Sequence, residues 1–144
     1  DNNKIYLDTL KDIEINQKIY LKSFEDTEKE LEKMFKEIEE SKMILNDSEV
    51  NIKISQYNNQ LNDFKNIVEK YNAHYQNQIL KIRDALLQEI LKLLEKYATD
   101  NSIDLVLNST SYLIASNSLD ITDIISKQLN KLNIKLEYNN FDKN

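Results

Sequence analysis

Apolar residues in the first third of the chain recur at alternating intervals of three and four residues. The seam positions are Leu10, Ile13, Gln17, Tyr20, Phe24, Thr27, Leu31, Met34, Ile38, Ser41 and Leu45. A period of about 3.5 residues is typical of a coiled-coil seam. Acid–base pairs such as Glu25 with Lys29 lie between the seam positions and support a solvated helix surface. The pattern predicts a helix over about residues 9–45.

A second seam of the same period follows at once. Its positions are Ile54, Tyr57, Leu61, Phe64, Val68, Tyr71 and Tyr75. Beyond Tyr75 extra four-residue steps interrupt the strict repeat, and additional leucines widen the apolar face. We therefore predict a helix over about residues 50–98, roughly 75 Å long at about 1.5 Å per residue. The part of this helix nearest residue 98 has two apolar faces, so it needs a second neighbour.

The short segment Asn46-Asp47-Ser48-Glu49 separates the two seams. Asn and Asp tolerate the left-handed conformation that ends a helix when glycine is absent. Asp47 or Ser48 is then expected to cap the following helix, with Glu49 in its first turn. Residues 9–98 are thus predicted to form an antiparallel coiled-coil hairpin with its tip at residues 46–49.

The composition excludes several classes of fold and site. Gly, Pro, Cys and Trp are all absent from the 144 residues, whereas an average domain has about 7% Gly and 5% Pro. Glycine-rich phosphate loops, disulfides and thiolate sites are therefore excluded. A single histidine, His74, excludes a two-histidine metal site within one copy, and we interpret it as a surface residue. We expect no catalytic residues, no metal and no cofactor, so the chain is not predicted to be an enzyme.

Charge is acidic overall and unevenly distributed. The net charge is −6, with 19 basic and 25 acidic residues. Residues 1–50 have 8 basic and 14 acidic side chains, whereas residues 51–98 have 7 and 5, so the two helices are complementary. Nucleic-acid binding needs clustered Lys and Arg, so it is not expected. No apolar run approaches the roughly 20 residues that span a bilayer, and we find no signal peptide in the sequence.

After the helix stop at residues 99–102, the pattern changes to short β-type runs. Residues 103–107 and 112–115 flank a turn at residues 108–111, and a terminal helix over about residues 121–132 follows, with Asp120 as its N-cap. So few strands enclose little core. We therefore expect a β body, made of residues 1–8 and 99–144, to be completed by other copies of the chain. The order of the Asn-rich end is left open.

Two motifs carry a family resemblance. Asp104-Leu-Val-Leu107 and Asp120-Ile-Thr-Asp123, placed after a long hairpin, resemble the C-terminal signature of the OmpH/Skp periplasmic chaperones. The resemblance covers at least residues 9–132. It implies a jellyfish-like homotrimer, in which strands of three subunits form the body and three hairpins surround a cavity. It also implies an ATP-independent holdase that encloses unfolded outer-membrane proteins in the periplasm.

The fold implied by the resemblance assigns apolar residues of the base to the trimer body. These are Ile103, Leu105, Leu107, Tyr112, Ile114, Leu87, Leu91 and Leu94. The family's body also uses an N-terminal strand, for which Lys4-Ile5-Tyr6-Leu7-Asp8 is the only candidate and is one residue shorter. Either it forms that strand, or the strand lies upstream. Contacts with lipopolysaccharide and anionic membranes are attributed to the arms of the family's best-known member, which is basic. They are not transferred to this chain, because its sequence pI is about 4.9 and no basic cluster is present.

Several apolar residues of the hairpin lie off the seam and are not needed for the contact between its two helices. These off-seam residues are Ile15, Ile19, Phe35, Met43, Ile44, Ile52 and Ile67. Either they broaden the packed stripe, or they line the inner face of a three-armed cage and contact clients. An alternative function is a structural or adaptor coiled coil that docks a defined partner. A spacer of that kind would bury all its apolar residues, whereas a holdase would leave some exposed between its arms.

Overall fold

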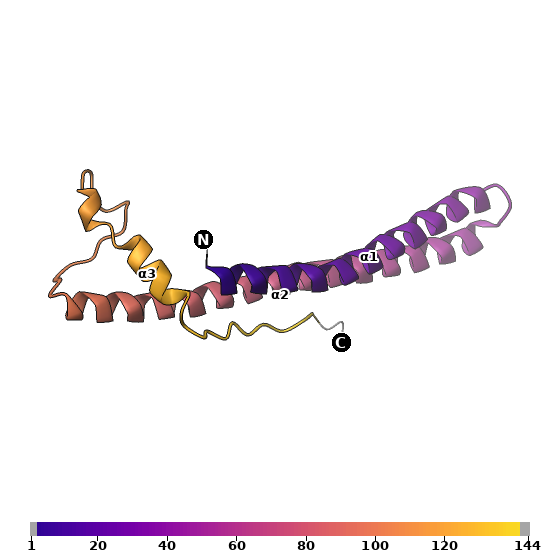
Figure 1. Ribbon diagram of the computed structural model, residues 1–144. Coiled ribbons are helices and arrows are strands. Elements are labelled where there is room, and N and C mark those ends of the chain that lie inside the picture. Colours follow the sequence, from indigo (N-terminus) through magenta and orange to yellow (C-terminus); the bar gives the residue numbers. More distant parts are fainter. Residues whose placement is uncertain (1–2, 142–144) are drawn as a thin grey trace. The chain divides into compact units, whose positions relative to one another are not determined.

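The computed structural model describes residues 3–141, and most of them are helical. In chain order the elements are α1 (Lys4–Ser41), α2 (Asp47–Asp100), the short 3₁₀ helix η1 (Asn117–Leu119) and α3 (Thr122–Leu129) (Figure 1). The prediction of a mostly helical chain with two long helices is confirmed. The described residues divide into a hairpin unit, residues 12–77 with 140–141, and a base unit, residues 3–11 with 78–139.

Burial in the hairpin unit follows the predicted seam. Every position of the first seam from Ile13 to Leu45 is buried or half-buried, and so is every position of the second seam from Ile54 to Tyr75. The apolar stripe of each helix is narrow, so a single antiparallel partner is enough to cover it. The two helices of this unit therefore supply each other's core.

Aromatic contacts fix the register of the hairpin. The ring of Phe35 lies 6.0 Å from that of Tyr57, between centroids. Phe24 lies 5.8 Å from Phe64 and 5.0 Å from Tyr71. Positions nearer the N-terminus of α1 contact positions nearer the C-terminus of α2, as antiparallel packing requires. Tilted and edge-on ring pairs at such distances are the favoured aromatic geometry.

The tip differs in detail from the prediction. Helix α1 ends at Ser41 rather than near residue 45, and α2 begins at Asp47. The N-cap is Asn46 rather than Asp47 or Ser48: its side-chain oxygen accepts the Glu49 N–H at 3.0 Å. In return, the Glu49 carboxylate accepts the Asn46 N–H at 3.2 Å. This reciprocal capping box pairs two backbone donors that the helix itself leaves free.

Of the two alternatives for the N-terminal strand, a strand at Lys4–Asp8 is not found, because these residues form the first turns of α1. Asn3 explains the difference. Its side-chain oxygen accepts the Tyr6 N–H at 3.0 Å, which caps the helix. Its amide nitrogen donates to the side-chain oxygen of Asn130 at 2.9 Å. One buried side chain of the base unit thus starts α1 and ties it to the residue that follows α3.

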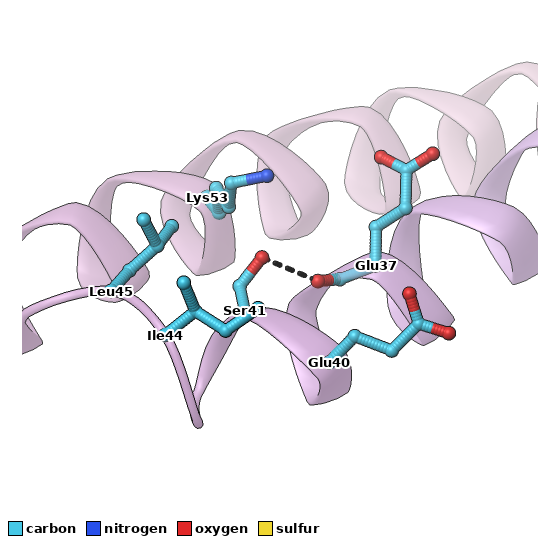
Figure 2. Close-up of a pocket in the computed structure, with 6 residues that line it drawn as sticks. All are labelled: Glu37, Glu40, Ser41, Ile44, Leu45 and Lys53. Carbon is cyan, nitrogen blue, oxygen red and sulfur yellow. Dashed lines mark hydrogen bonds between the residues drawn. The ribbon is translucent and has the colours of Figure 1, made fainter.

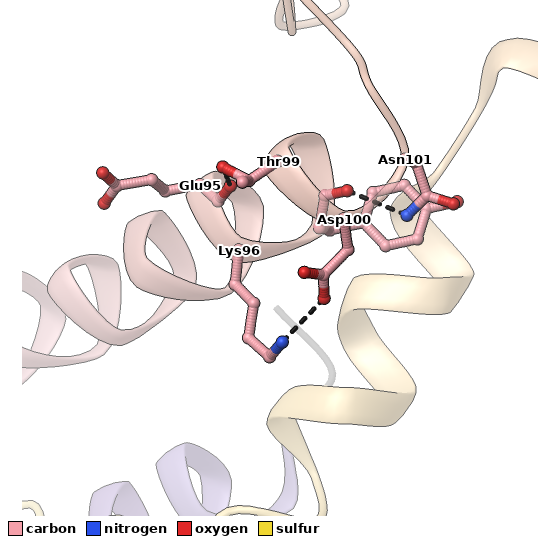
Figure 3. Close-up of polar contacts among 6 residues, drawn as sticks. Glu95, Lys96, Thr99, Asp100 and Asn101 are labelled. Carbon is pink, nitrogen blue, oxygen red and sulfur yellow. Dashed lines mark hydrogen bonds and ion pairs between the residues drawn. The ribbon is translucent and has the colours of Figure 1, made fainter.

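Helix α2 ends in a Schellman-type motif without glycine. Ser102 adopts the left-handed conformation, with φ of 54°. The Ile103 N–H donates to the Ala98 carbonyl at 2.8 Å, and the Ser102 N–H donates to the Thr99 carbonyl at 3.3 Å. Side chains reinforce the last turn (Figure 3): Lys96 pairs with Asp100 at 2.6 Å, and the Asn101 amide donates to the Tyr97 carbonyl at 2.8 Å.

The segment after α2 has no strand within the described residues. The turn at residues 108–111 is present, since the Ser111 N–H donates to the Asn108 carbonyl at 3.0 Å, but residues 103–107 and 112–115 are unpaired on either side of it. A strand needs a neighbouring edge for its backbone groups, and this segment finds none among residues 3–141. The β body thus stays a prediction, and residues 1–2 and 142–144 of it lie outside the described residues.

The terminal helix is shorter than predicted. It covers Thr122–Leu129 rather than about residues 121–132, and Ile121 occupies the N-cap position. The Asp120 carboxylate nevertheless accepts the Thr122 N–H at 2.9 Å. Hydrogen bonding to Thr122 lowers the pKa of Asp120. Ile125 and Leu129 bury the apolar face of α3 in the base unit.

Candidate functional site

The off-seam residues of the hairpin are largely exposed. Six of the seven, all except the half-buried Ile67, face solvent, with exposed fractions from 50% at Phe35 to 92% at Met43. Ile67 is covered because it lies between the seam residues Phe64 and Tyr71 on one helix face. Isolated exposed apolar residues are common on proteins. Phe35 also contacts Tyr57 on the opposite helix, whereas the other five are 57% to 92% exposed and add little to the packed stripe.

These exposed residues form separate groups. Ile15 and Ile19 lie one turn apart on α1, whereas Met43 and Ile44 lie in the tip connection and Ile52 lies near the start of α2. The hairpin unit therefore presents several small apolar areas. A surface of this kind favours many weak contacts over a single deep pocket.

Two shallow hollows accompany these areas. The first, of about 370 Å³, lies at the tip and is lined by Ile44, Leu45 and Ser41 with Glu37, Glu40 and Lys53 (Figure 2). The Ser41 hydroxyl donates to the Glu37 carbonyl at 2.6 Å beside it. The second, of about 390 Å³, is lined by Phe35 and Tyr57 among others, with Glu28 and Glu32. Each hollow thus combines apolar side chains with carboxylates.

Exposed ion pairs run along α1. Glu25 pairs with Lys29 at 2.6 Å, and Glu32 pairs with Lys36 at 2.7 Å. Hydrogen bonding to the lysine, followed by its charge, lowers the pKa of each glutamate. Such pairs within one helix contribute little to stability in water. Their effect is to keep the helix surface hydrated between the apolar groups.

An aromatic cluster in the hairpin unit holds Phe141. The Phe141 ring lies 5.5 Å from Tyr20, 5.5 Å from Tyr71 and 5.7 Å from His74, between ring centroids. The Tyr20 hydroxyl donates a hydrogen bond to the Phe141 carbonyl. We call Tyr20, Tyr71 and His74 the Phe141 socket. Burial, followed by the neighbouring tyrosines, raises the pKa of the Tyr71 phenol.

Sequence reasoning missed this cluster, and it placed His74 on the surface, whereas the side chain is half-buried in the socket. A signal was present. Leu132, Ile134, Leu136 and Tyr138 alternate with polar residues, which is the period-two pattern of an extended segment with one covered face. The structure covers those four side chains partly and leaves the polar ones exposed.

The residues assigned to the trimer body are exposed in the single chain, with two exceptions. Leu105 is 69% exposed and Ile114 is 92% exposed. Leu107, Tyr112, Leu87 and Leu91 are also exposed, whereas Ile103 and Leu94 are half-buried. Exposed apolar side chains indicate an interaction site where they lie together in one patch. We call this set the base patch.

Neither a metal-binding cluster nor a membrane-spanning helix is present among the described residues. Among residues 3–141, no group of three or more His, Asp or Glu side chains is arranged to hold a metal ion. In the same range, no helix combines the length and apolar character needed to cross a bilayer. The described residues present exposed apolar side chains, two hollows that include carboxylates and an aromatic socket.

Comparison with known proteins gives one family. The family described as "Outer membrane protein (OmpH-like)" matches residues 2–129. The match includes α1 and α2 and ends at the last residue of α3. No curated protein and no solved structure gives a significant match.

Proposed function

The chain belongs to the OmpH-like family, and we propose that it is an ATP-independent periplasmic holdase, which encloses unfolded outer-membrane proteins and prevents their aggregation. One observation carries the proposal beyond family membership. Apolar side chains such as Ile15, Ile19 and Phe35 stay exposed on a hairpin whose seam residues from Ile13 onward are buried or half-buried. Hydrated charges separate these side chains, which keeps a binding surface soluble when no client is present.

The mechanism follows from many weak contacts. Burying apolar surface contributes about 25 cal/mol per Å², so one isoleucine that covers part of a client side chain contributes about 1 kcal/mol or less. Several such contacts hold an unfolded chain, yet each one breaks easily. A client that buries more apolar area by folding into a membrane then leaves without nucleotide hydrolysis.

We further propose that three copies assemble through the base patch. Leu105, Ile114, Leu87 and Leu91 are exposed in one chain, and contact with other copies would remove them from water. The unpaired residues 103–107 and 112–115 would then find strand partners in neighbouring subunits. The three hairpins would border a shared space, in which a client contacts more than one arm.

Suppression of aggregation tests the proposed function. An unfolded outer-membrane β-barrel protein is diluted from urea into buffer with the purified chain and without nucleotide, and light scattering is recorded. We expect suppression at about one trimer per client. Replacement of Ile15 and Ile19 by Gln should weaken this suppression several-fold, since up to about 2 kcal/mol of apolar contact is lost on each arm.

A matched variant controls for general changes to α1. Lys18→Gln with Lys22→Gln alters exposed residues of the same turns but removes no apolar side chain. It should retain most of the suppression. Wild-type protein that leaves the scattering unchanged would refute the holdase proposal. If only one defined protein is captured, the alternative of an adaptor that docks a specific partner replaces it; the exposed off-seam residues favour the holdase.

A further inference from the structure

The C-terminal segment beyond the family match behaves as a bound extended peptide. The match ends at residue 129. In the base unit, Leu132, Ile134, Leu136 and Tyr138 are half-buried, whereas the intervening polar side chains are exposed. The Asn139 N–H donates to the side-chain oxygen of Gln78 at 3.1 Å, and Gln78 is only 7% exposed. A buried side chain thus holds the backbone of this segment.

In the hairpin unit, Phe141 fills the socket defined above. Three rings surround the Phe141 side chain, which is 7% exposed. The Tyr20 hydroxyl donates to the Phe141 backbone carbonyl. The socket therefore recognises an aromatic ring and one peptide group. Neither feature depends on the rest of the ligand's sequence, so any extended segment with a suitably placed aromatic residue presents the same groups.

We propose that the Phe141 socket is a binding subsite for an aromatic side chain of an extended client segment, and that the chain's own C-terminal segment occupies it as a tethered competitor. The identity of the client rests on the proposed function. Strands of outer-membrane barrels alternate apolar and polar residues and bear aromatic residues at their ends. Residues 132–138 show the same alternation, and the aromatic residue Phe141 follows three positions after Tyr138.

Tethering gives the competitor a specific effect. A segment attached to the same chain competes at an effective concentration that is commonly millimolar. A short peptide therefore meets a socket that is mostly occupied, and its apparent affinity falls in proportion to the open fraction. A long unfolded client also contacts the off-seam residues, which compensates for displacing Phe141. The device would admit long clients and reject short peptides.

Binding of a peptide in trans tests the competition. The probe is a peptide with the sequence of residues 132–141, fluorescein-labelled at its N-terminus and amidated at its C-terminus, and its anisotropy is measured with the full chain. Removing the tethered ring with Phe141→Ala should open the socket and tighten probe binding about tenfold. A control peptide with alanine in place of its own phenylalanine should bind wild type and Phe141→Ala with the same affinity. Equal binding of the probe to wild type and Phe141→Ala, or no binding to either, overturns the proposal.

A second variant tests the backbone contact. In the Phe141→Ala background, Tyr20→Phe retains the ring but removes the hydroxyl. It should weaken probe binding about three- to tenfold, since one hydrogen bond of typical net strength is lost. Unchanged affinity would rule out the peptide-carbonyl contact as part of recognition. Circular dichroism of each variant establishes that the helices are intact.

A measurement on the unmodified protein avoids dependence on any variant. Hydrogen exchange of a peptic fragment that contains Asn139 and Phe141 is followed with and without an unfolded β-barrel client. Displacement predicts at least about tenfold faster exchange of this fragment in the complex. Unchanged protection in a formed complex overturns the proposal. The aggregation assay separates the two claims. If Phe141→Ala binds the probe more tightly but the chain does not suppress client aggregation, the socket is retained and the holdase proposal is refuted. If the chain suppresses aggregation but probe binding does not change, only the socket proposal is refuted.

Discussion

The hairpin unit and the base unit treat the same kind of side chain in opposite ways. In the hairpin unit, seam residues such as Phe24 and Tyr71 are buried by the other helix of the same chain. In the base unit, Leu105 and Ile114 have equally apolar side chains and remain exposed. The difference shows that periodicity predicts burial only where a complementary stripe is available in the same chain. Where no such stripe exists, the pattern indicates a partner elsewhere.

The strongest way to break this contrast is to remove a seam side chain from the hairpin. Phe24→Ala should lower the free energy of unfolding by about 3–5 kcal/mol, because a buried aromatic ring is lost and a cavity remains. Urea unfolding followed by circular dichroism measures the change. Leu21→Ala, at a position 54% exposed on the same helix, should change it by less than about 0.5 kcal/mol. Equal effects would contradict the assignment of the core.

The base patch is tested by a charge at its most exposed apolar position. Ile114→Asp should shift the mass in sedimentation velocity from trimer toward monomer, since burying an unpaired carboxylate costs several kcal/mol. Met43→Asp is a matched control, because Met43 and Ile114 are both 92% exposed but Met43 lies at the hairpin tip. Its mass should not change. A wild-type chain that sediments as a monomer at micromolar concentration would refute assembly.

A substitution of Asn3 tests its two contacts at the start of α1. Asn3→Ala removes both the helix cap and the hydrogen bond to Asn130. We expect a loss of about 2 kcal/mol from the free energy of unfolding, about half from each contact. Asn3→Asp is the comparison variant, because a carboxylate still caps the helix but cannot donate to Asn130. Asn3→Asp should recover roughly half of the free energy of unfolding that Asn3→Ala loses. Equal stability of the two variants would contradict the role of Asn3 as the helix cap.

Alkaline pH should weaken the hairpin unit through Tyr71. Burial raises the pKa of this phenol above its ordinary value of 10.0, so the folded state favours the neutral form. The resulting stability is present below the unfolded pKa of about 10 and is lost as the pH rises through the folded pKa. Urea midpoints should fall between pH 9 and pH 11. Tyr71→Phe should show a smaller fall, and an identical fall would assign it to other groups.

The smallest expected effect concerns the end of α2. Ser102→Gly should raise the free energy of unfolding by about 1 kcal/mol or less, because glycine adopts a positive φ without the steric cost that serine meets. Thermal unfolding detects a gain of this size. Ser102→Ala serves as the control, since it lacks the hydroxyl but keeps the Cβ. A similar gain with alanine would mean that φ is not the cause.

The hairpin was predictable because its determinants are local and repeated. Each seam residue recurs every three or four positions, and the complementary seam begins within ten residues of the first one's end. Of the seven apolar residues that the sequence places off the seam, six are exposed in the structure. Only Ile67 differs, because a helix face is wider than a single stripe and its flanks are partly covered.

Other features depend on single residues or distant contacts. Lys4–Asp8 fits a short strand as well as a helix, and the cap at Asn3 decides between them. The Phe141 socket unites residues more than 60 positions apart, Phe141 with His74 and Tyr20. No local pattern reports such a contact. The alternation from Leu132 to Tyr138 predicts the covered face of the segment, but not the surface that covers it.

The reciprocal pair Asn46 and Glu49 makes the turn of the hairpin independent of the length of its arms. Both partners lie within four residues, and neither bonds to the seam through these contacts. Removing or adding seven residues in each helix would leave the seam in phase and the turn intact. The length of the hairpin can thus change in heptad steps without a change in the residues that form its turn.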